Sequence, residues 1–114
     1  MQRLALPCFL FLLLPTSLLA TPYDHIHLAA DNALEAAQWY AKHFGGTPTR
    51  FRDSPDTSLP IDRVKIGDIY VIFFEREPGE GSVGSGVDHI GFSMANVEQV
   101  FNAIVADGGT GLGE

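Results

Sequence analysis

Polar and apolar residues follow two different periods along the chain, and each change of period marks a predicted element. Residues 24–28 alternate between polar and apolar side chains, which is the period of a half-buried strand. Between residues 33 and 44 the apolar side chains recur every three or four positions, as on one face of a helix. Asn32 is the predicted N-cap of this helix, and Gly45 and Gly46 are predicted to end it.

Three further strands are predicted after the helix, at residues 47–52, 61–66 and 69–77. The last two are expected to form a hairpin, because the Gly-Asp pair between them suits a two-residue turn. A Gly-rich connector at residues 78–86 separates this first unit from the remainder of the chain.

The same pattern begins again 64 residues later. The run DHIHL at residues 24–28 returns as DHIGF at residues 88–92, and a second amphipathic helix is expected to follow it. Asn96 is the predicted N-cap of that helix. The first unit, at about residues 23–77, is predicted to be strand, helix, strand, strand, strand. The second unit, at about residues 87–114, stops after its helix.

These elements predict an α+β fold, in which paired βαβββ modules form a concave mixed sheet and the second module is truncated after its helix. An open sheet needs a second layer to cover its apolar face, and no further strands complete the second module. We therefore interpret the chain as a fragment of a longer two-module protein. The alternative is a protomer that borrows strands from a second copy and so forms a homodimer.

The first twenty residues have the layout of a signal peptide rather than of a folded element. Arg3 provides a positive start, residues 4–14 are apolar, and Ala20 is a small residue at the expected cleavage position. The apolar run is too short to span a bilayer comfortably, although an uncleaved anchor is the alternative. We expect residues 21–114 to be one exported domain, periplasmic or extracellular, with no stable membrane association after cleavage.

The amino-acid composition excludes several classes of protein and of binding site. The 114 residues carry a net charge of −7, with 46% hydrophobic and 18% charged residues, which indicates one small globular domain. The acidic balance argues against a nucleic-acid partner, because phosphate binding requires clustered Lys and Arg. The single cysteine, Cys8, excludes an internal disulfide and a multi-cysteine metal site.

The repeated pattern resembles the vicinal-oxygen-chelate superfamily of glyoxalases, bleomycin-resistance proteins and extradiol dioxygenases. The resemblance covers residues 23–114 and is carried by DHIHL at 24–28, Asn32, Trp39-Tyr40, Phe44-Gly45-Gly46 and VDHIGFS at 87–93. It implies a metal-dependent lyase, isomerase or dioxygenase that acts on a small oxygen-chelating substrate. The alternative is a metal-free protein of the bleomycin-resistance type that binds or sequesters a small molecule.

The resemblance also implies where a metal would bind. In this family the first strand of each module supplies a His and the last strand an acidic or amide ligand, which points to His25, His89 and Glu75. Imidazole and carboxylate ligands suit one divalent ion, whether zinc, iron, nickel or manganese. Strand alternation places His27 on the same face as His25, so His27 is a candidate substrate contact. Phe73 is a second candidate, because its face of the strand at 69–77 could line an apolar pocket, with core packing as the alternative. Arginines at positions 50 and 52 are a weak signal for an anionic substrate.

Overall fold

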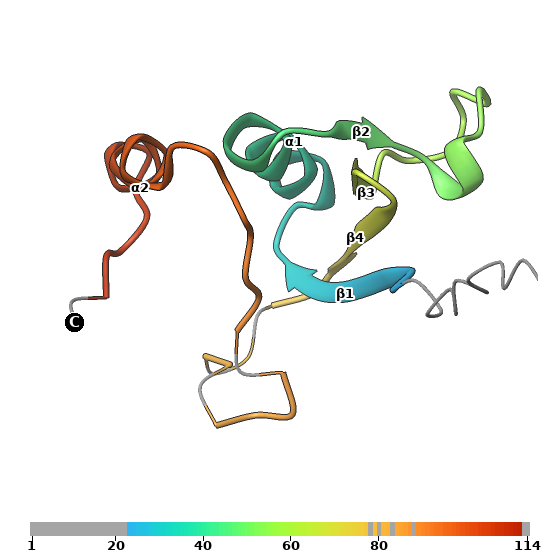
Figure 1. Ribbon diagram of the computed structural model, residues 1–114. Coiled ribbons are helices and arrows are strands. Elements are labelled where there is room, and N and C mark those ends of the chain that lie inside the picture. Colours follow the sequence, from blue (N-terminus) through green and yellow to red (C-terminus); the bar gives the residue numbers. More distant parts are fainter. Residues whose placement is uncertain (1–22, 78, 80, 83, 88, 113–114) are drawn as a thin grey trace, which may run out of the picture.

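The computed structural model describes residues 23–77, 79, 81–82, 84–87 and 89–112, and the predicted signal peptide lies outside them. Four strands and two α-helices make up an α+β fold, as the sequence predicts (Figure 1). Within this described part, no helix is both long enough and apolar enough to cross a membrane.

The four strands form one mixed sheet. They are β1 (His25–Ala30), β2 (Thr47–Thr49), β3 (Arg63–Ile66) and β4 (Ile69–Glu75), in the spatial order β1-β4-β3-β2. β1 runs parallel to β4, whereas the β2–β3 and β3–β4 pairs are antiparallel. The parallel pair needs a crossover connection, and the segment between β1 and β4, which contains a helix and the strands β2 and β3, provides it.

Helix α1 (Ala33–Phe44) covers one face of this sheet (Figure 1). Its small residues Ala33 and Ala37 are buried, which lets the helix backbone approach the strands closely. Opposite them, Val64, Val71 and Phe73 complete the buried core. The other face of the sheet is not covered by α1, and we call it the open face.

Both ends of α1 are fixed as the sequence suggests. The Oδ1 atom of Asn32 accepts a hydrogen bond from the backbone N–H of Glu35 at 3.0 Å, so Asn32 is the N-cap. At the other end the chain turns at positive φ through Gly45 and Gly46. A Cβ on Gly46 would lie 2.3 Å from the carbonyl oxygen of Lys65, so only glycine fits there.

Helix α2 (Val97–Ala106) forms where the repeat predicts it but has a different environment from α1. None of its residues is buried, and it lies beside α1 and away from the four strands (Figure 1). The Asn96 side chain makes no capping hydrogen bond, although the residue occupies the N-cap position.

The structure corrects several predicted strands. The strand predicted at 47–52 is only β2, and the chain then enters a short 3₁₀ helix, η1 (Phe51–Asp53). β3 begins later than expected, and β4 ends two residues earlier. In the second unit, residues 89–94 form no strand, because no neighbouring strand among the described residues offers them backbone hydrogen bonds. Phe92 from this segment instead stacks on Phe44, with ring centroids 4.1 Å apart.

Candidate functional site

Alternation along β1 and β4 divides the candidate residues between the two faces of the sheet. His25 pairs with Tyr70, and His27 pairs with Ile72, so these side chains share the open face. Phe74, two residues further along β4, extends the same face, and its ring centroid lies 4.6 Å from that of His27. The two histidines are therefore brought together, with ring centroids 4.8 Å apart.

A cavity of about 520 Å³ lies over the open face. Both histidines line it, together with aromatic, charged and aliphatic side chains, most of them from β3, β4 and η1. Its lining comprises Asp24, His25, His27, Phe51, Arg52, Asp62, Arg63, Tyr70, Ile72 and Phe74. We call it the open-face cavity.

Asp24 orients the first histidine. Its Oδ2 atom lies 2.5 Å from Nδ1 of His25, which is a short, charge-assisted contact between neighbours in the chain. When the carboxylate accepts the Nδ1 proton, the lone pair on Nε2 of His25 is left for another partner. The same carboxylate–imidazole arrangement accompanies histidines that bind metals or hold protons in place.

The remaining charges of the open-face cavity are partly matched within it. Asp62 accepts two hydrogen bonds from Arg63, at 2.7 Å and 2.9 Å, in a bidentate pair. Arg52 lies over the ring of Phe51, with its guanidinium carbon 5.1 Å from the ring centroid. Arg63 lies 5.2 Å from the same ring, so Phe51 contacts two cations.

Three of the predicted site residues lie away from this cavity, and two of them, Phe73 and Glu75, are on the other face of the sheet. Phe73 is on the face covered by α1, is only 3% exposed and belongs to the core. Glu75 shares that face, and its Oε1 atom accepts a hydrogen bond of 3.3 Å from the backbone N–H of Ala33. Glu75 thus helps to cap the N-terminus of α1, where an anion also suits the helix dipole.

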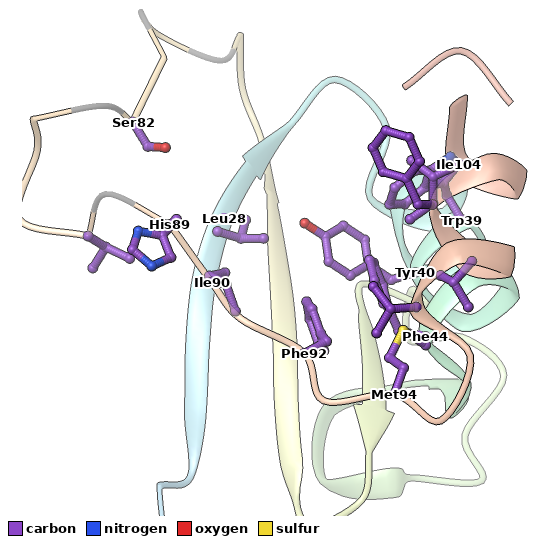
Figure 2. Close-up of a pocket in the computed structure, with 14 residues that line it drawn as sticks. Leu28, Trp39, Tyr40, Phe44, Ser82, His89, Ile90, Phe92, Met94 and Ile104 are labelled. Atoms are coloured by element: carbon purple, nitrogen blue, oxygen red, sulfur yellow. The ribbon is translucent and has the colours of Figure 1, made fainter. Parts of the chain in front are cut away.

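His89 lies in a second cavity, of about 490 Å³, that we call the interhelix cavity. Figure 2 shows His89 at one end of it beside Leu28 and Ile90, while Trp39 of α1 and Ile104 of α2 lie at the other end. Most of its lining is apolar or aromatic. Tyr40 also lines it, and burial raises the pKa of its hydroxyl.

One protein-family model matches most of the chain. The family model of the Glyoxalase/Bleomycin resistance protein/Dioxygenase superfamily matches residues 23–114, which is every residue after the first 22. The chain belongs to this superfamily. The glyoxalase superfamily is the one that the repeated Asp-His-Ile signature resembles, so the sequence-based assignment is confirmed.

The chain also resembles a curated protein of the same superfamily whose name states an activity. The chain is 28% identical over 99 residues to a 4-hydroxyphenylpyruvate dioxygenase of the yeast Yarrowia lipolytica. The match covers 75% of this chain and 25% of the relative, so the chain spans about a quarter of that protein. No solved structure gives a significant match.

Members of the glyoxalase superfamily commonly use a divalent metal. Here His25, His89 and Glu75 lie in three different places, and their joint role as ligands stays a prediction. The reason is that residues 89–94 do not join the sheet, so His89 is not brought to the open face. Within the described residues, no group of three or more His, Cys, Asp or Glu side chains could hold a metal. His25 and His27 supply two imidazole nitrogens, which is an incomplete metal site.

Several residues of the open-face cavity were not singled out from the sequence. Asp24 could have been, because an Asp precedes the His in both copies of the signature. Alternation along a strand places Tyr70, Ile72 and Phe74 on one face, but their pairing with β1 depends on a strand register that the sequence does not reveal. In the sequence Arg52 is a weak signal for an anionic substrate, and it lines the cavity at the point where the predicted strand gives way to η1.

Proposed function

We propose that the open-face cavity binds a small, oxygen-bearing organic substrate, and that the chain is a module of a dioxygenase-type member of the glyoxalase superfamily. One observation carries this proposal. His25, held by Asp24, and His27 lie together in a cavity of about 520 Å³ whose other lining residues are three aromatic side chains, two arginines, Asp62 and Ile72. Such a cavity is large enough for a single-ring ligand and offers imidazole nitrogens to its oxygen atoms.

The named relative supports the choice of substrate class. Its name gives 4-hydroxyphenylpyruvate as the compound on which that dioxygenase acts, which is an aromatic ring joined to a 2-oxo acid. The open-face cavity contains side chains that suit both parts. Phe51 and Phe74 offer ring faces, and Arg52 offers a cation. We carry over the substrate class, an aromatic compound with neighbouring oxygen atoms, and not the reaction of the whole relative.

Metal dependence is a further part of the proposal. The Asp24–His25 pair favours His25 as the first donor, because metal-binding histidines usually donate their second ring nitrogen to a carboxylate. In the superfamily the metal, whether zinc, iron, nickel or manganese, would act as a Lewis acid toward substrate oxygens. The described residues alone give an incomplete donor set for such a metal.

Titration with 4-hydroxyphenylpyruvate tests the substrate site. We expect the backbone amide signals of β1, β4 and η1 to shift in NMR spectra, and we expect His27→Ala to weaken binding by about tenfold. Glu98→Gln on α2 is the matched control, because Glu98 is exposed and lies outside both cavities. Shifts confined to α1 and α2, with unchanged affinity in the His27 variant, would contradict the proposed site.

Metal analysis tests the role of the histidines separately. The wild-type chain is dialysed against Zn²⁺ and compared with His25→Ala, His89→Ala and Asp24→Asn. We expect loss of most bound metal in the His25 variant and about a tenfold lower affinity in the Asp24 variant. If the His25 and His89 variants both keep the wild-type metal content, both histidines are structural.

The metal-free alternative has its own observation in support. The interhelix cavity is lined mainly by apolar and aromatic side chains, as expected of a site that sequesters a hydrophobic ligand (Figure 2). Shifts confined to Trp39, Phe44 and Phe92 in the same titration, independent of metal, would support this second function.

A further inference from the structure

The turn beside the open-face cavity has an unusual backbone. Arg52 and Asp53 are neither glycine nor asparagine, yet both have positive φ angles, of 56° and 52°. Left-handed backbone conformations are uncommon for residues with a Cβ, and two in succession are rarer still. Such a conformation persists only where the surrounding contacts hold it, and it is often found where a side chain must be aimed at a ligand.

The contacts that hold this turn come from the open face of the sheet. The Oδ2 atom of Asp53 accepts a hydrogen bond from the hydroxyl of Tyr70 at 2.6 Å and one from Nζ of Lys65 at 3.3 Å. These contacts, the Tyr70 hydrogen bond above all, lower the pKa of Asp53, so its carboxylate is charged at neutral pH. Asp53 therefore fastens η1 to β3 and β4.

Fastened in this way, the turn leaves the neighbouring Arg52 at the cavity. Arg52 lines the open-face cavity and lies over the ring of Phe51. The other arginine noted in the sequence, Arg50, is used differently, because its Nε donates to the carbonyl oxygen of Leu59 at 2.9 Å. The structure thus separates a structural arginine from one that is exposed to the cavity.

The charged side chains of the open-face cavity differ in whether they have a partner. Of its two carboxylates, Asp62 is paired with Arg63 and Asp24 contacts His25. No carboxylate within the described residues forms an ion pair with Arg52. Arg52 is therefore the arginine of the cavity that is left without a carboxylate partner, although the whole chain has a net charge of −7. A local cation on an acidic protein attracts an anion.

We propose that Arg52 is the anion-recognition residue of the open-face cavity and that the ligand is an aromatic carboxylic acid. The guanidinium binds the carboxylate of the ligand, and the aromatic ring of the ligand packs on Phe51 and Phe74. This inference rests on the proposed function, because it assigns a chemical class to the same cavity. It goes beyond the proposed function in two points, namely that binding requires a negative charge on the ligand and that Arg52 is the residue that recognises this charge.

Binding of phenylpyruvate and of its uncharged amide tests this requirement. The two probes have the same ring and the same keto group and differ only in the carboxylate. We expect the wild-type chain to bind phenylpyruvate about tenfold more tightly than the amide in calorimetric titrations, as for one charge-assisted contact in a partly exposed site. Arg52→Gly and Arg52→Asn should abolish this preference, and Arg52→Lys should restore part of it.

The Arg52 variants should keep the fold, so that a loss of preference reports binding and not unfolding. Glycine and asparagine tolerate the left-handed conformation, so both variants should unfold at the same or higher urea concentration than the wild type. Arg76→Gln is the matched control, because it removes the same charge at an exposed position outside the cavity and should keep the tenfold preference. Loss of preference in this control would show a general charge effect and overturn the assignment.

The remaining outcomes separate this inference from the proposed function. If both probes bind equally well in the wild type, with shifts on β1 and β4, the proposed cavity stands and the role of Arg52 is wrong. If the Arg52→Gly variant keeps the tenfold preference, another residue recognises the carboxylate and the inference is also wrong. If neither probe binds, the proposed function fails together with it.

Discussion

Phe73 and Phe74 are adjacent in the chain, and β4 directs their rings to opposite faces of the sheet. Phe73 is 3% exposed and packs under α1, whereas Phe74 is 49% exposed and lines the open-face cavity. A strand thus gives neighbouring residues of the same type unrelated roles, one in stability and one in the candidate site. Phe73, the candidate substrate contact named from the sequence, lies on the face covered by α1, and its contact with substrate stays a prediction.

This pair provides a prediction about stability. Phe73→Ala should lower the free energy of unfolding by about 3 kcal/mol, because it opens a cavity in a core of few residues. Phe74→Ala should lower it by less than about 1 kcal/mol, since half of that side chain is already in solvent. Urea denaturation monitored by circular dichroism measures both. A larger loss for Phe74→Ala would mean that the open face is covered in solution.

The two helices occupy equivalent positions in the repeat, yet only one of them is anchored. In α1, Asn32 caps the first turn and the alanine face is packed on the sheet. In α2, Asn96 occupies the same position without a side-chain hydrogen bond, and no residue of the helix is buried. A similar sequence pattern therefore specifies a helix in both places and a docked helix in only one, because docking needs the sheet beneath it.

The two asparagines allow a matched test of capping. Asn32→Ala should cost about 1 kcal/mol of the free energy of unfolding, because a donor at the start of α1 loses its partner. Asn96→Ala should cost only a few tenths of a kcal/mol, since its side chain makes no such bond. Thermal or urea unfolding of the two variants is compared. Equal costs would show that Asn96 caps α2 in solution.

The ends of the two helices are joined by a small group of charges. Oδ2 of Asp107, just after α2, lies 2.8 Å from Nζ of Lys42 and 2.8 Å from Nε2 of His43. His43 is 6% exposed, and its ring lies 4.6 Å from that of Trp39, so the contact reaches into the folded unit. We call this group the helix clasp, and it is a polar connection between the C-terminal ends of α1 and α2.

The helix clasp should respond to acid. Hydrogen bonds from Lys42 and then His43 lower the pKa of Asp107 below its usual 3.8. A lowered carboxylate pKa stabilises the clasp above pH 3.8, and this contribution is lost as the pH falls through the lowered value. Below the lowered pKa of Asp107, we expect the backbone amides of α2 to lose protection from hydrogen exchange, relative to the intrinsic exchange rate at the same pH. The amides of β4 should lose less protection.

Asp107→Asn serves as the comparison for the acid response. It should already show fast exchange of α2 at pH 7, and acid should then add little, because the charged acceptor is absent. Glu98→Gln, on the exposed side of α2, should behave as the wild type. Unchanged exchange of α2 in the Asp107 variant would show that apolar contacts such as Phe44 with Phe92 hold the helix without the clasp.

At the scale of the whole molecule, the sequence predicts the elements better than their arrangement. The periods of 24–28 and 33–44 identify β1 and α1, since each is a local property of the chain. The strand expected at 47–52 breaks because the turn at Arg52 and Asp53 is held by Tyr70 and Lys65, which are distant in sequence. Contacts of this kind are tertiary, and no local pattern reveals them.

In the candidate site too, local features are predictable from the sequence and contacts between distant segments are not. Alternation in β1 correctly predicts that His25 and His27 share a face, because that depends on one strand alone. The expected approach of His89 depends on a second strand joining the sheet, and residues 89–94 do not form one here. A site built within one element is therefore predictable from sequence, whereas a site between two units requires knowledge of how the units pair.

The exposed face of α2 leads to a prediction about association. Val97, Phe101 and Val105 lie on one face of this helix and are 65%, 50% and 43% exposed. Side chains of this type, gathered on one face of a helix, favour burial against another surface, and the net charge of −7 opposes the approach of a second copy. We therefore expect concentration-dependent self-association that strengthens as salt screens the charges.

Light scattering at low and high salt measures this association. Val97→Ser combined with Phe101→Ser should leave the chain monomeric at concentrations where the wild type associates, because the apolar area on α2 is largely removed. Leu34→Ser is the control, since Leu34 is 42% exposed but lies on α1. A wild type that stays monomeric at high salt would mean that α2 covers its own apolar face in solution, against the side of α1 that lines the interhelix cavity.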